Sequence, residues 1–344
     1  MVPLKLLVVD DSKLFRRVIC RIFETDENTQ VAGEASDGQE ALKMISEVKP
    51  DVITMDIIMP DMDGLTALKH IMIKTPTPTL MLSNVTEEGA DVTFDSLKYG
   101  AVDFIQKPSS LKDLDMEEQR KRIIRKVKLA SKVQAAEIQY LRTNNKDREA
   151  GPEKINCDYM FAVGTSEGGY GALLKIVPQL TRDIPAAFII VLSATSEHVS
   201  AFARYLDKYS PIRVERARDG VPIEGGGCYI SSADEYVTVN PENGNFILQV
   251  SSAPFPERGG AIDMLMFSVA DAMRENSGGI ILSGSGEDGI EGMGEILRLG
   301  GSTIVQDPRS CFSKEMVQKI IEKYKIDIIA SELEMAEAIN SRFG

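Results

Sequence analysis

The stretch LKLLVVDDS, residues 4–12, decides the fold of the first part of the chain. Its branched, apolar run has the composition of a buried strand, and Asp10 and Asp11 follow directly at its end. Strands that alternate with helices predict a doubly wound parallel sheet, whose chemistry lies at the carboxyl ends of the strands. Four further stretches continue that pattern: residues 30–35, 51–55, 79–82 and 102–105.

A second pattern of strands and helices starts near Cys157. Its turns are rich in glycine and its strands are short and apolar, which again predicts a doubly wound α/β sheet. The expected strands are residues 159–163, 187–192, 228–230, 236–239, 246–250 and 279–283.

The segment between the two patterns is charged and polar. Residues 112–142 are helical by propensity, and residues 144–154 have the composition of a linker. The sequence therefore predicts three parts: an α/β domain over residues 1–110, a helical linker over residues 111–155, and a second α/β domain over residues 156–344.

The composition narrows the function classes. The 344 residues carry a formal net charge of −13, which argues against broad binding to nucleic acid or to an anionic membrane surface. No apolar run approaches the roughly 20 residues of a membrane span, so no membrane insertion is predicted. The first apolar run turns acidic at Asp10, unlike a signal peptide, and the four cysteines are far apart. These features predict a cytoplasmic protein.

Three carboxylates follow two strands of the first predicted sheet. Asp10 and Asp11 come after the first strand, and Asp56 comes after the third. In a doubly wound sheet these strand ends are neighbours, so we expect the three side chains to converge. Like charges packed together are unfavourable without a cation, and oxygen ligands suit a hard divalent ion. The sequence therefore predicts a Mg²⁺ site at this edge of the sheet.

A hydroxyl and an ammonium follow two other strands of the same sheet. Ser83 comes after the fourth strand and Lys107 after the fifth. Both groups would contact the oxygens of a phosphoryl group, whose transfer depends mainly on positioning and charge neutralisation. Taken singly, each residue has an ordinary alternative as a helix-terminal charge, a turn former or a surface lysine. Five such residues at successive strand ends favour a phosphoryl-transfer site.

These segments resemble a two-component receiver domain, which has a flavodoxin-like fold. The resemblance covers residues 1 to about 110, and it implies that a partner histidine kinase phosphorylates Asp56. The segments that carry it are VVDDS at residues 8–12, TMDIIMPDMDG at residues 54–64, Ser83, and GAVDFIQKP at residues 100–108.

The same resemblance implies a role for each residue of the set. Lys107 would contact the phosphoryl group. Ser83 and Phe104 would form the switch that reports phosphorylation. The ligands of Mg²⁺ would be Asp10, Asp11, Asp56 and the backbone carbonyl of Ile58.

Two glycine-rich turns carry the chemistry of the second domain. In GTSEGG, residues 164–169, Ser166 would stand at the start of a helix, where backbone N–H groups stabilise an oxyanion. The alternative is a turn whose serine caps the helix. In GSGEDG, residues 284–289, Asp288 would either orient a base, as the acid of a triad does, or serve a helix N-terminus.

Together with the receiver, the second domain resembles the chemotaxis protein-glutamate methylesterases, the CheB family. Such enzymes hydrolyse methyl-glutamate esters on methyl-accepting chemoreceptors, and some deamidate receptor glutamines. Their receiver blocks the active site until it is phosphorylated, which implies a sensor histidine kinase of the chemotaxis type as a partner. The resemblance implies Ser166 as the nucleophile and Asp288 as the orienting acid. Its segments are FAVGTSEGG at residues 161–169, AIDMLMFSVA at 261–270, GIILSGSGEDGIEGM at 279–293 and GGSTIVQDPRSC at 300–311.

The chain departs from the family pattern around the serine. The family's triad histidine follows the strand after the serine helix, and matching without gaps puts Ser193 at that position. A serine hydroxyl cannot act as a base near neutral pH. His198, expected in the first turn of the next helix, is a possible substitute base. Glu167 stands where the family has a small hydroxyl residue, and Ser285 where it has a methionine-like residue.

The sequence leaves three functions open. The first is a phosphorylation-activated receptor methylesterase or deamidase. The second is a catalytically degenerate regulator that binds a receptor or kinase and competes for phosphoryl groups. The third is a hydrolase with an altered base, either His198 or Glu167.

Overall fold

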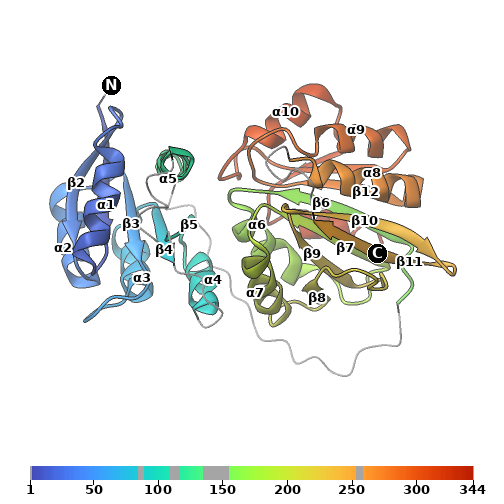
Figure 1. Ribbon diagram of the computed structural model, residues 1–344, viewed down its shortest axis with the longest axis horizontal. Helices are drawn as coiled ribbons and strands as arrows, with labels where there is room; N and C mark the ends of the chain where they lie inside the picture. The colour runs from blue at the N-terminus through green and yellow to red at the C-terminus, as the bar shows by residue number, and fades with distance from the viewer. Residues whose placement is uncertain (1, 84–88, 108–116, 135–154, 253–258, 344) are drawn as a thin grey trace. The chain divides into compact units, whose positions relative to one another are not determined.

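The chain forms two compact units, Met1–Arg142 and Thr143–Gly344, in a computed structural model. The structure describes residues 2–83, 89–107, 117–134, 155–252 and 259–343 (Figure 1). In that part of the chain, no helix combines the length and the apolar character needed to cross a membrane.

The first unit contains a five-stranded parallel sheet with the strand order β2-β1-β3-β4-β5. All five predicted strands are confirmed, each with ends within one residue of the expected position. The strands are β1 (Leu4–Val9), β2 (Thr29–Ala35), β3 (Val52–Asp56), β4 (Thr79–Ser83) and β5 (Asp103–Gln106). The helices are α1 (Lys13–Phe23), α2 (Gly38–Val48), α3 (Gly64–Lys74), α4 (Ala90–Lys98) and α5 (Glu117–Ala130).

Local residue choices fix where these helices begin. Ser12 caps α1 by accepting a hydrogen bond from the Phe15 N–H at 3.3 Å. Asp63 caps α3 in the same way, through the Thr66 N–H at 2.7 Å. At Gly64 a Cβ atom would lie 1.9 Å from the carbonyl oxygen of Asp56, so only glycine lets α3 begin against the end of β3.

The helix α5 belongs to the first unit, which corrects the expected boundary at residue 110. Lys126 of α5 donates to Asp103 Oδ2 at 2.7 Å and to the Phe104 carbonyl at 2.8 Å, both on β5. Arg120 of α5 donates to Thr25 at 2.6 Å. The pattern of propensities gave a helix over 112–142 but no packing partner, whereas the structure ends α5 at Ala130 and turns the chain over 131–134. The predicted linker at 144–154 lies outside the described residues.

The second unit contains a seven-stranded parallel sheet with the order β14-β13-β12-β6-β7-β9-β8, together with an antiparallel pair, β10 and β11. The predicted doubly wound architecture is confirmed. The strands are β6 (Tyr159–Thr165), β7 (Ala186–Leu192), β8 (Arg213–Arg216), β9 (Gly227–Ser232), β10 (Glu235–Glu242), β11 (Asn245–Ser252), β12 (Ser277–Ile281), β13 (Ser302–Gln306) and β14 (Ile328–Ala330).

Helices cover both faces of this sheet. In Figure 1, α8, α9 and α10 lie on one face, and α6 and α7 lie on the other. The helices are α6 (Gly169–Ile176), α7 (Ser196–Asp207), α8 (Ala261–Met273), α9 (Ile290–Arg298), α10 (Glu315–Lys323) and α11 (Met335–Asn340). Gly164 of β6 has no room for a Cβ atom, which would lie 2.4 Å from Ile262, so α8 packs closely over the end of this strand.

Three strands of the second unit, β8, β13 and β14, were not predicted from the sequence. A fourth, β12, begins and ends two residues earlier than expected. β8 has the sequence RVER, β14 has only three residues, and β13 had been assigned no structure. The strand expected at 279–283 ends at Ile281, because the Ser283 N–H donates to the side chain of Gln306 at 2.8 Å and not to a neighbouring strand.

Both sheets have a point at which the chain changes direction across the sheet. In the first unit the chain runs outward from β1 to β2 and then returns to β3, so the switch lies between β1 and β3. In the second unit it lies between β6 and β12. Ligands of open α/β sheets bind beyond the carboxyl ends of the strands at such a point. Each unit therefore offers one predicted place for a site.

Candidate functional sites

The first site lies at the switch between β1 and β3. One carboxylate oxygen from each of Asp10, Asp11 and Asp56 lies within 4.8 Å of the other two. Asp10 is fully buried, Asp56 is 7% exposed, and Asp11 is exposed. The expectation that these three side chains converge is confirmed.

Lys107 brings a positive charge to the three carboxylates. Its Nζ lies 2.6 Å from Asp10 Oδ2 and 2.7 Å from Asp56 Oδ2. Burial raises the pKa of the Asp56 carboxyl, and the contact with Lys107 offsets that shift only in part. Since one ammonium faces three carboxylates, the cluster keeps excess negative charge.

The donor set of this cluster fits a divalent cation. Asp10 Oδ2 is buried and, apart from the ammonium of Lys107, has no hydrogen-bond partner among the described residues. Asp11 and Asp56 add carboxylate oxygens from the same edge. A hard cation prefers such an all-oxygen set, and it would neutralise the remaining charge.

The predicted switch residues lie on the neighbouring strands. The Ser83 hydroxyl shares a hydrogen bond of 2.6 Å with the hydroxyl of Thr93, which belongs to α4. Phe104 of β5 is 5% exposed, and its ring packs edge-on against Phe94 of α4 at 6.2 Å between centroids. Both residues therefore connect the strand ends to α4. The side chain of Ile58 is 77% exposed.

The second site lies at the switch between β6 and β12. The Ser166 N–H donates to the Ser283 carbonyl at 3.1 Å, and the Thr165 hydroxyl donates to the same carbonyl at 2.7 Å. Gly168 starts α6 with φ +83°, and a Cβ atom there would lie 2.5 Å from Phe312. At Gly284 a Cβ atom would lie 2.6 Å from Ser166 Oγ. Glycines thus allow the two turns to approach each other.

The hydroxyl of Ser166 lies between an acceptor and a donor. It donates to Glu167 Oε2 at 2.9 Å, and it accepts a hydrogen bond from the Ser285 N–H at 2.8 Å. The Ser285 hydroxyl donates to the same oxygen, Glu167 Oε2, at 2.6 Å. Two hydroxyls and one carboxylate therefore form a closed set of hydrogen bonds.

Ser166 opens onto a cleft of about 1000 Å³. Ser193, the residue at the expected histidine position, and Asp288 line the same cleft. The Ser193 N–H donates to the Thr165 carbonyl at 3.1 Å, which ties it beside the serine turn. Ser193 is exposed. The expected triad positions therefore meet at one cleft, but with a hydroxyl in place of an imidazole.

His198 does not join this site. It lies in the first turn of α7, as expected, but it is 5% exposed and is not among the described residues that line the cleft. Its N–H donates to the capping residue Thr195 at 3.5 Å. The idea of His198 as a substitute base is therefore not supported by its position.

Asp288 serves a helix terminus. Its two oxygens accept hydrogen bonds from the N–H groups of Ile262 at 3.2 Å and Asp263 at 3.0 Å, in the first turn of α8. A carboxylate is stabilised at the positive end of a helix. Burial raises the pKa of Asp263, the Gly292 N–H lowers it, and the nearby Asp288 adds to the rise. This geometry matches the helix-terminus alternative for Asp288.

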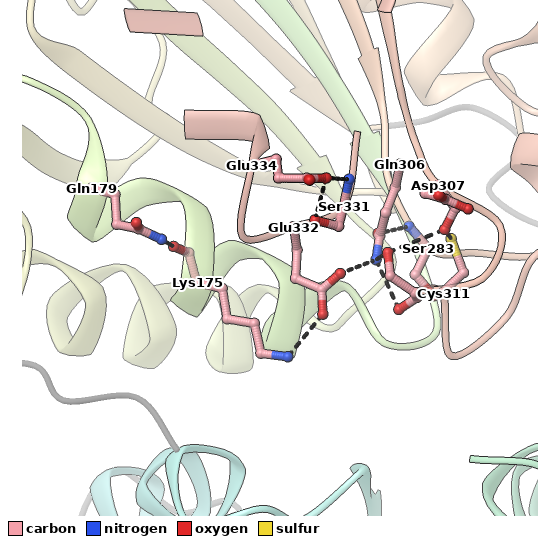
Figure 2. A network of polar contacts seen from close by, with 10 residues as sticks. Lys175, Gln179, Ser283, Gln306, Asp307, Cys311, Ser331, Glu332 and Glu334 are labelled. Atoms are coloured by element: carbon pink, nitrogen blue, oxygen red, sulfur yellow. Dashed lines mark hydrogen bonds and ion pairs between the residues drawn. The ribbon is translucent and has the colours of Figure 1, made fainter. Parts of the chain in front are cut away.

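A polar network around Gln306 holds Ser283, whose carbonyl accepts the Ser166 N–H (Figure 2). Gln306, 2% exposed, accepts from the Ser283 N–H at 2.8 Å and donates to Glu332 at 3.1 Å. Lys175 of α6 donates to the other oxygen of Glu332 at 2.8 Å. Burial raises the pKa of Glu332, but the charge and hydrogen bond of Lys175 outweigh it, so the pKa lies below its ordinary value. Gln306 also donates to the Ser310 carbonyl at 3.1 Å. The sequence did not predict this network, although both residues lie in the quoted segment at 300–311.

Comparisons with known families cover both units. Residues 161–339 match the CheB methylesterase family, and residues 6–117 match the response regulator receiver domain family. The second match reaches into α5 and agrees with the extended first unit.

Curated relatives match nearly the whole chain. A protein-glutamate methylesterase/protein-glutamine glutaminase of Pyrococcus horikoshii is 35% identical, over 98% of this chain and 92% of that protein. A protein of the same name from Symbiobacterium thermophilum is 33% identical, over 99% of this chain and 98% of that protein.

Solved structures resemble each unit separately. The CheB methylesterase catalytic domain of Thermotoga maritima is 24% identical with a TM-score of 0.52, over 54% of this chain and 98% of that one. This match supports the fold of the second unit. The response regulator domain of Thermotoga maritima CheB is 44% identical with a TM-score of 0.35, over 38% of this chain and 98% of that one.

Proposed function

The chain belongs to the CheB methylesterase family and carries a response regulator receiver domain, and on that premise we propose a phosphorylation-controlled esterase. In this proposal the receiver takes a phosphoryl group on Asp56. The second unit then hydrolyses glutamate methyl esters on chemoreceptors, or deamidates receptor glutamines, through Ser166.

The position of Lys107 carries the first half of the proposal. Its ammonium contacts both Asp10 and Asp56 at salt-bridge distance, so it lies where an incoming phosphoryl oxygen needs a positive charge. Bound Mg²⁺ would supply further charge neutralisation, held by carboxylate oxygens and one carbonyl. The residues that would hold it are Asp10, Asp11, Asp56 and Ile58, the last through its backbone carbonyl.

The signal would pass through the residues between the strand ends and α4. Ser83 would exchange its hydrogen bond with Thr93 for one with a phosphoryl oxygen. Phe104, packed against Phe94 on α4, would respond to that exchange because both contacts lie on the same helix. The surface formed by α4 and β5 is therefore the proposed output of the receiver.

Ser166 carries the second half of the proposal. It stands directly after β6 at the switch point and opens onto the cleft. Its hydroxyl donates a hydrogen bond to the carboxylate of Glu167. A hydroxyl in this setting suits nucleophilic attack on an ester or amide carbonyl. The leaving groups would be methanol from a methyl ester and ammonia from an amide.

The partners follow from the same proposal. A sensor histidine kinase of the chemotaxis type would donate the phosphoryl group, and methyl-accepting chemoreceptors would supply the substrate side chains. The cytoplasm is the proposed location of both encounters. The overall acidic charge of the chain gives no support to a nucleic-acid partner.

Phosphoryl transfer is tested with acetyl phosphate and Mg²⁺ on the full chain. The wild type should be labelled once, and Asp56→Asn should remove the label. Asp61→Asn is a matched control, because Asp61 is exposed and its φ of 60° suits asparagine. Label that persists in Asp56→Asn would refute the assignment.

Hydrolysis is tested by methanol release from a methylated chemoreceptor. Ser166→Ala should reduce release to background, while Ser200→Ala on α7 should leave it unchanged. Equal release from the wild type and Ser166→Ala would reject serine-based hydrolysis and would favour the second unit as a docking module.

A further inference from the structure

Among the described residues of the second unit, no imidazole lines the cleft at the serine site. The chain has two histidines, of which His70 lies on α3 in the first unit. His198 is buried on α7 and does not line the cleft that the described residues form. A serine hydroxyl is a weak nucleophile unless a neighbouring group takes its proton. Another side chain has to fill that role if Ser166 acts as proposed.

The carboxylate of Glu167 is the group in contact with that proton. Ser166 Oγ donates to Glu167 Oε2 at 2.9 Å, within the range at which a general base acts. We propose that Glu167 is the general base of the serine site and that Ser285 is a positioning residue that holds it in place. This inference rests on the proposed hydrolysis by Ser166 and names the base of that reaction.

Ser285 holds both reacting groups at once. Its N–H donates to Ser166 Oγ at 2.8 Å, and its hydroxyl donates to Glu167 Oε2 at 2.6 Å. Glu167 and Ser285 are also two of the positions that depart from the family pattern near the serine. Two unrelated losses would not be expected to contact each other and the nucleophile. Their contact instead indicates one substituted arrangement.

Four of the carboxylates that line the cleft have other partners. Asp288 accepts two amides of α8, and Asp263 accepts the Gly292 N–H at 2.6 Å. Glu287 pairs with Lys319 at 3.1 Å, and Glu291 pairs with Lys323. Asp234 and Glu322 complete the acidic lining. Among the described residues, Glu167 is the carboxylate that contacts the Ser166 hydroxyl.

Hydrolysis of the ester by this route needs water and no further reactant. Ser166 Oγ forms a bond to the ester carbonyl carbon as its proton moves to Glu167 Oε2. The ester C–O bond then breaks, and that proton moves from Glu167 to the methoxide oxygen, which leaves as methanol. Water then forms a bond to the carbonyl carbon of the acyl-serine and gives a proton to Glu167. The bond from that carbon to Ser166 Oγ breaks, the glutamate side chain leaves as the carboxylic acid, and Glu167 returns the proton to Ser166 Oγ. For an amide the proton moves to the departing nitrogen.

The nature of the base decides the acid side of the pH profile. A carboxylate keeps its basic form down to about pH 4.3, whereas an imidazole loses it below about pH 6.5. The Ser285 hydroxyl donates to the carboxylate of Glu167, and such a hydrogen bond favours the charged, basic form. The acid limb should therefore lie below the imidazole range and depend on Ser285.

Modification of Ser166 by phenylmethanesulfonyl fluoride tests the base without a receptor. The full chain is treated across pH 4 to 8, and adduct formation is followed by intact mass. The wild type should form one adduct, and Ser166→Ala should form none. Glu167→Gln, nearly equal in shape, should slow the reaction by about 100-fold because a general base contributes that much or more.

Ser285→Ala separates positioning from folding. It should slow modification by about tenfold and move the acid limb to higher pH, because the hydrogen bond that favours the charged carboxylate is lost. Ser285→Thr, which keeps a hydroxyl, should restore both. A purely structural role would change the rate without moving the limb.

A histidine placed at the family position gives a second test. Glu167→Gln/Ser193→His should regain modification, with the acid limb near pH 6.5. A wild-type limb already at pH 6.5 or above would overturn the assignment, and that measurement needs no variant. So would a Glu167→Gln protein that reacts at the wild-type rate.

Methanol release from methylated chemoreceptor distinguishes the two proposals. If Ser166→Ala loses release and Glu167→Gln keeps it, hydrolysis by Ser166 stands and Glu167 is not its base. If neither variant differs from the wild type, serine-based hydrolysis and its base both fall. Loss in both variants supports both proposals.

Discussion

The two sites of this protein lie at equivalent places in two separate sheets. Asp10 follows β1 and Asp56 ends β3, whereas Ser166 and Ser285 follow β6 and β12. Each site therefore lies at the switch point of its sheet. The first brings three carboxylates and an ammonium together, whereas no histidine is among the described residues that line the cleft of the second. We infer that the topology of the sheet decides where a site lies, whereas the side chains in the turns decide which reaction it supports.

The two sites also handle charge differently. In the first, Lys107 contacts two carboxylates directly, and the surplus negative charge fits a metal ion. In the second, Glu167 next to Ser166 receives two hydroxyl hydrogen bonds. Because their neighbours differ, the carboxylates are proposed metal ligands in the first site and a proposed base in the second. Four substitutions test this difference between the two units.

The largest expected effect concerns the buried ion pair of the first unit. Lys126→Met should destabilise that unit by about 3–5 kcal/mol, because the Asp103 carboxylate, 2% exposed, would lose its partner. Urea unfolding of the full chain should show the shift in the transition of the first unit alone. Lys126→Met/Asp103→Leu should recover most of the loss, and a double variant as unstable as the single one would contradict this explanation.

The next effect concerns the charge at the phosphoryl site. Lys107→Met should slow labelling by acetyl phosphate by about 100-fold, since it removes the ammonium nearest to Asp56. Initial labelling rates at saturating Mg²⁺ give the comparison. Lys128→Met, at a partly exposed pair with Asp26, is the control and should label normally. Equal rates in all three proteins would remove Lys107 from the site.

A third change tests the close approach of the two turns in the second unit. Gly284→Ala would place a Cβ atom 2.6 Å from Ser166 Oγ, so methanol release should fall by about 30-fold through misplacement of the nucleophile. Gly171→Ala is the matched control, because a Cβ atom there meets nothing within 4 Å. Its helical position favours alanine, and its activity should be unchanged. Similar losses in both variants would argue against a local effect.

The smallest effect concerns the polar network around Gln306. The pKa of Glu332 is lowered in the folded protein, so it stabilises the fold above its ordinary pKa and loses that effect as pH falls through the folded value. Lys175→Met should therefore cost the second unit about 1–2 kcal/mol at pH 7, less than a fully buried pair because Lys175 is 19% exposed.

The pH dependence checks that explanation. The difference in unfolding free energy between Lys175→Met and the wild type should shrink as pH falls below about 4, where Glu332 becomes protonated in both proteins. Arg309→Ala removes a side chain that is 90% exposed beside Asp307, and it should show no measurable change at any pH. A constant difference for Lys175→Met from pH 7 to pH 3 would mean that charge is not its cause.

The sequence alone was sufficient for the first site. Alternating strands fixed the sheet, and the positions of Asp10, Asp11 and Asp56 after those strands were enough to predict their convergence. The limit of α5 was not predictable in this way, because helix propensity does not say what a helix packs against. Its contact with β5 depends on a tertiary pair, Lys126 with Asp103.

The second site was predictable in place but not in detail. The turns around Ser166 and Asp288 were found, but the hydrogen bonds of Asp288 to α8 join residues far apart in the sequence. The sequence did not mark Gln306 as a site residue, because a single glutamine at a strand end belongs to no motif. In the fold its buried amide hydrogen-bonds to Ser283 and Glu332. The sequence marks Glu167 as a departure from the family pattern and as one possible base, and its contact with Ser166 favours the role of base.

The central claim is that phosphorylation at the first site controls chemistry at the second. Methanol release from a methylated chemoreceptor should be measured with the full chain, with and without acetyl phosphate and Mg²⁺, in the wild type and in Asp56→Asn. The phosphodonor should raise methanol release by the wild type and should have no effect on Asp56→Asn. An unchanged rate in the wild type, or an equal rise in both proteins, would contradict it.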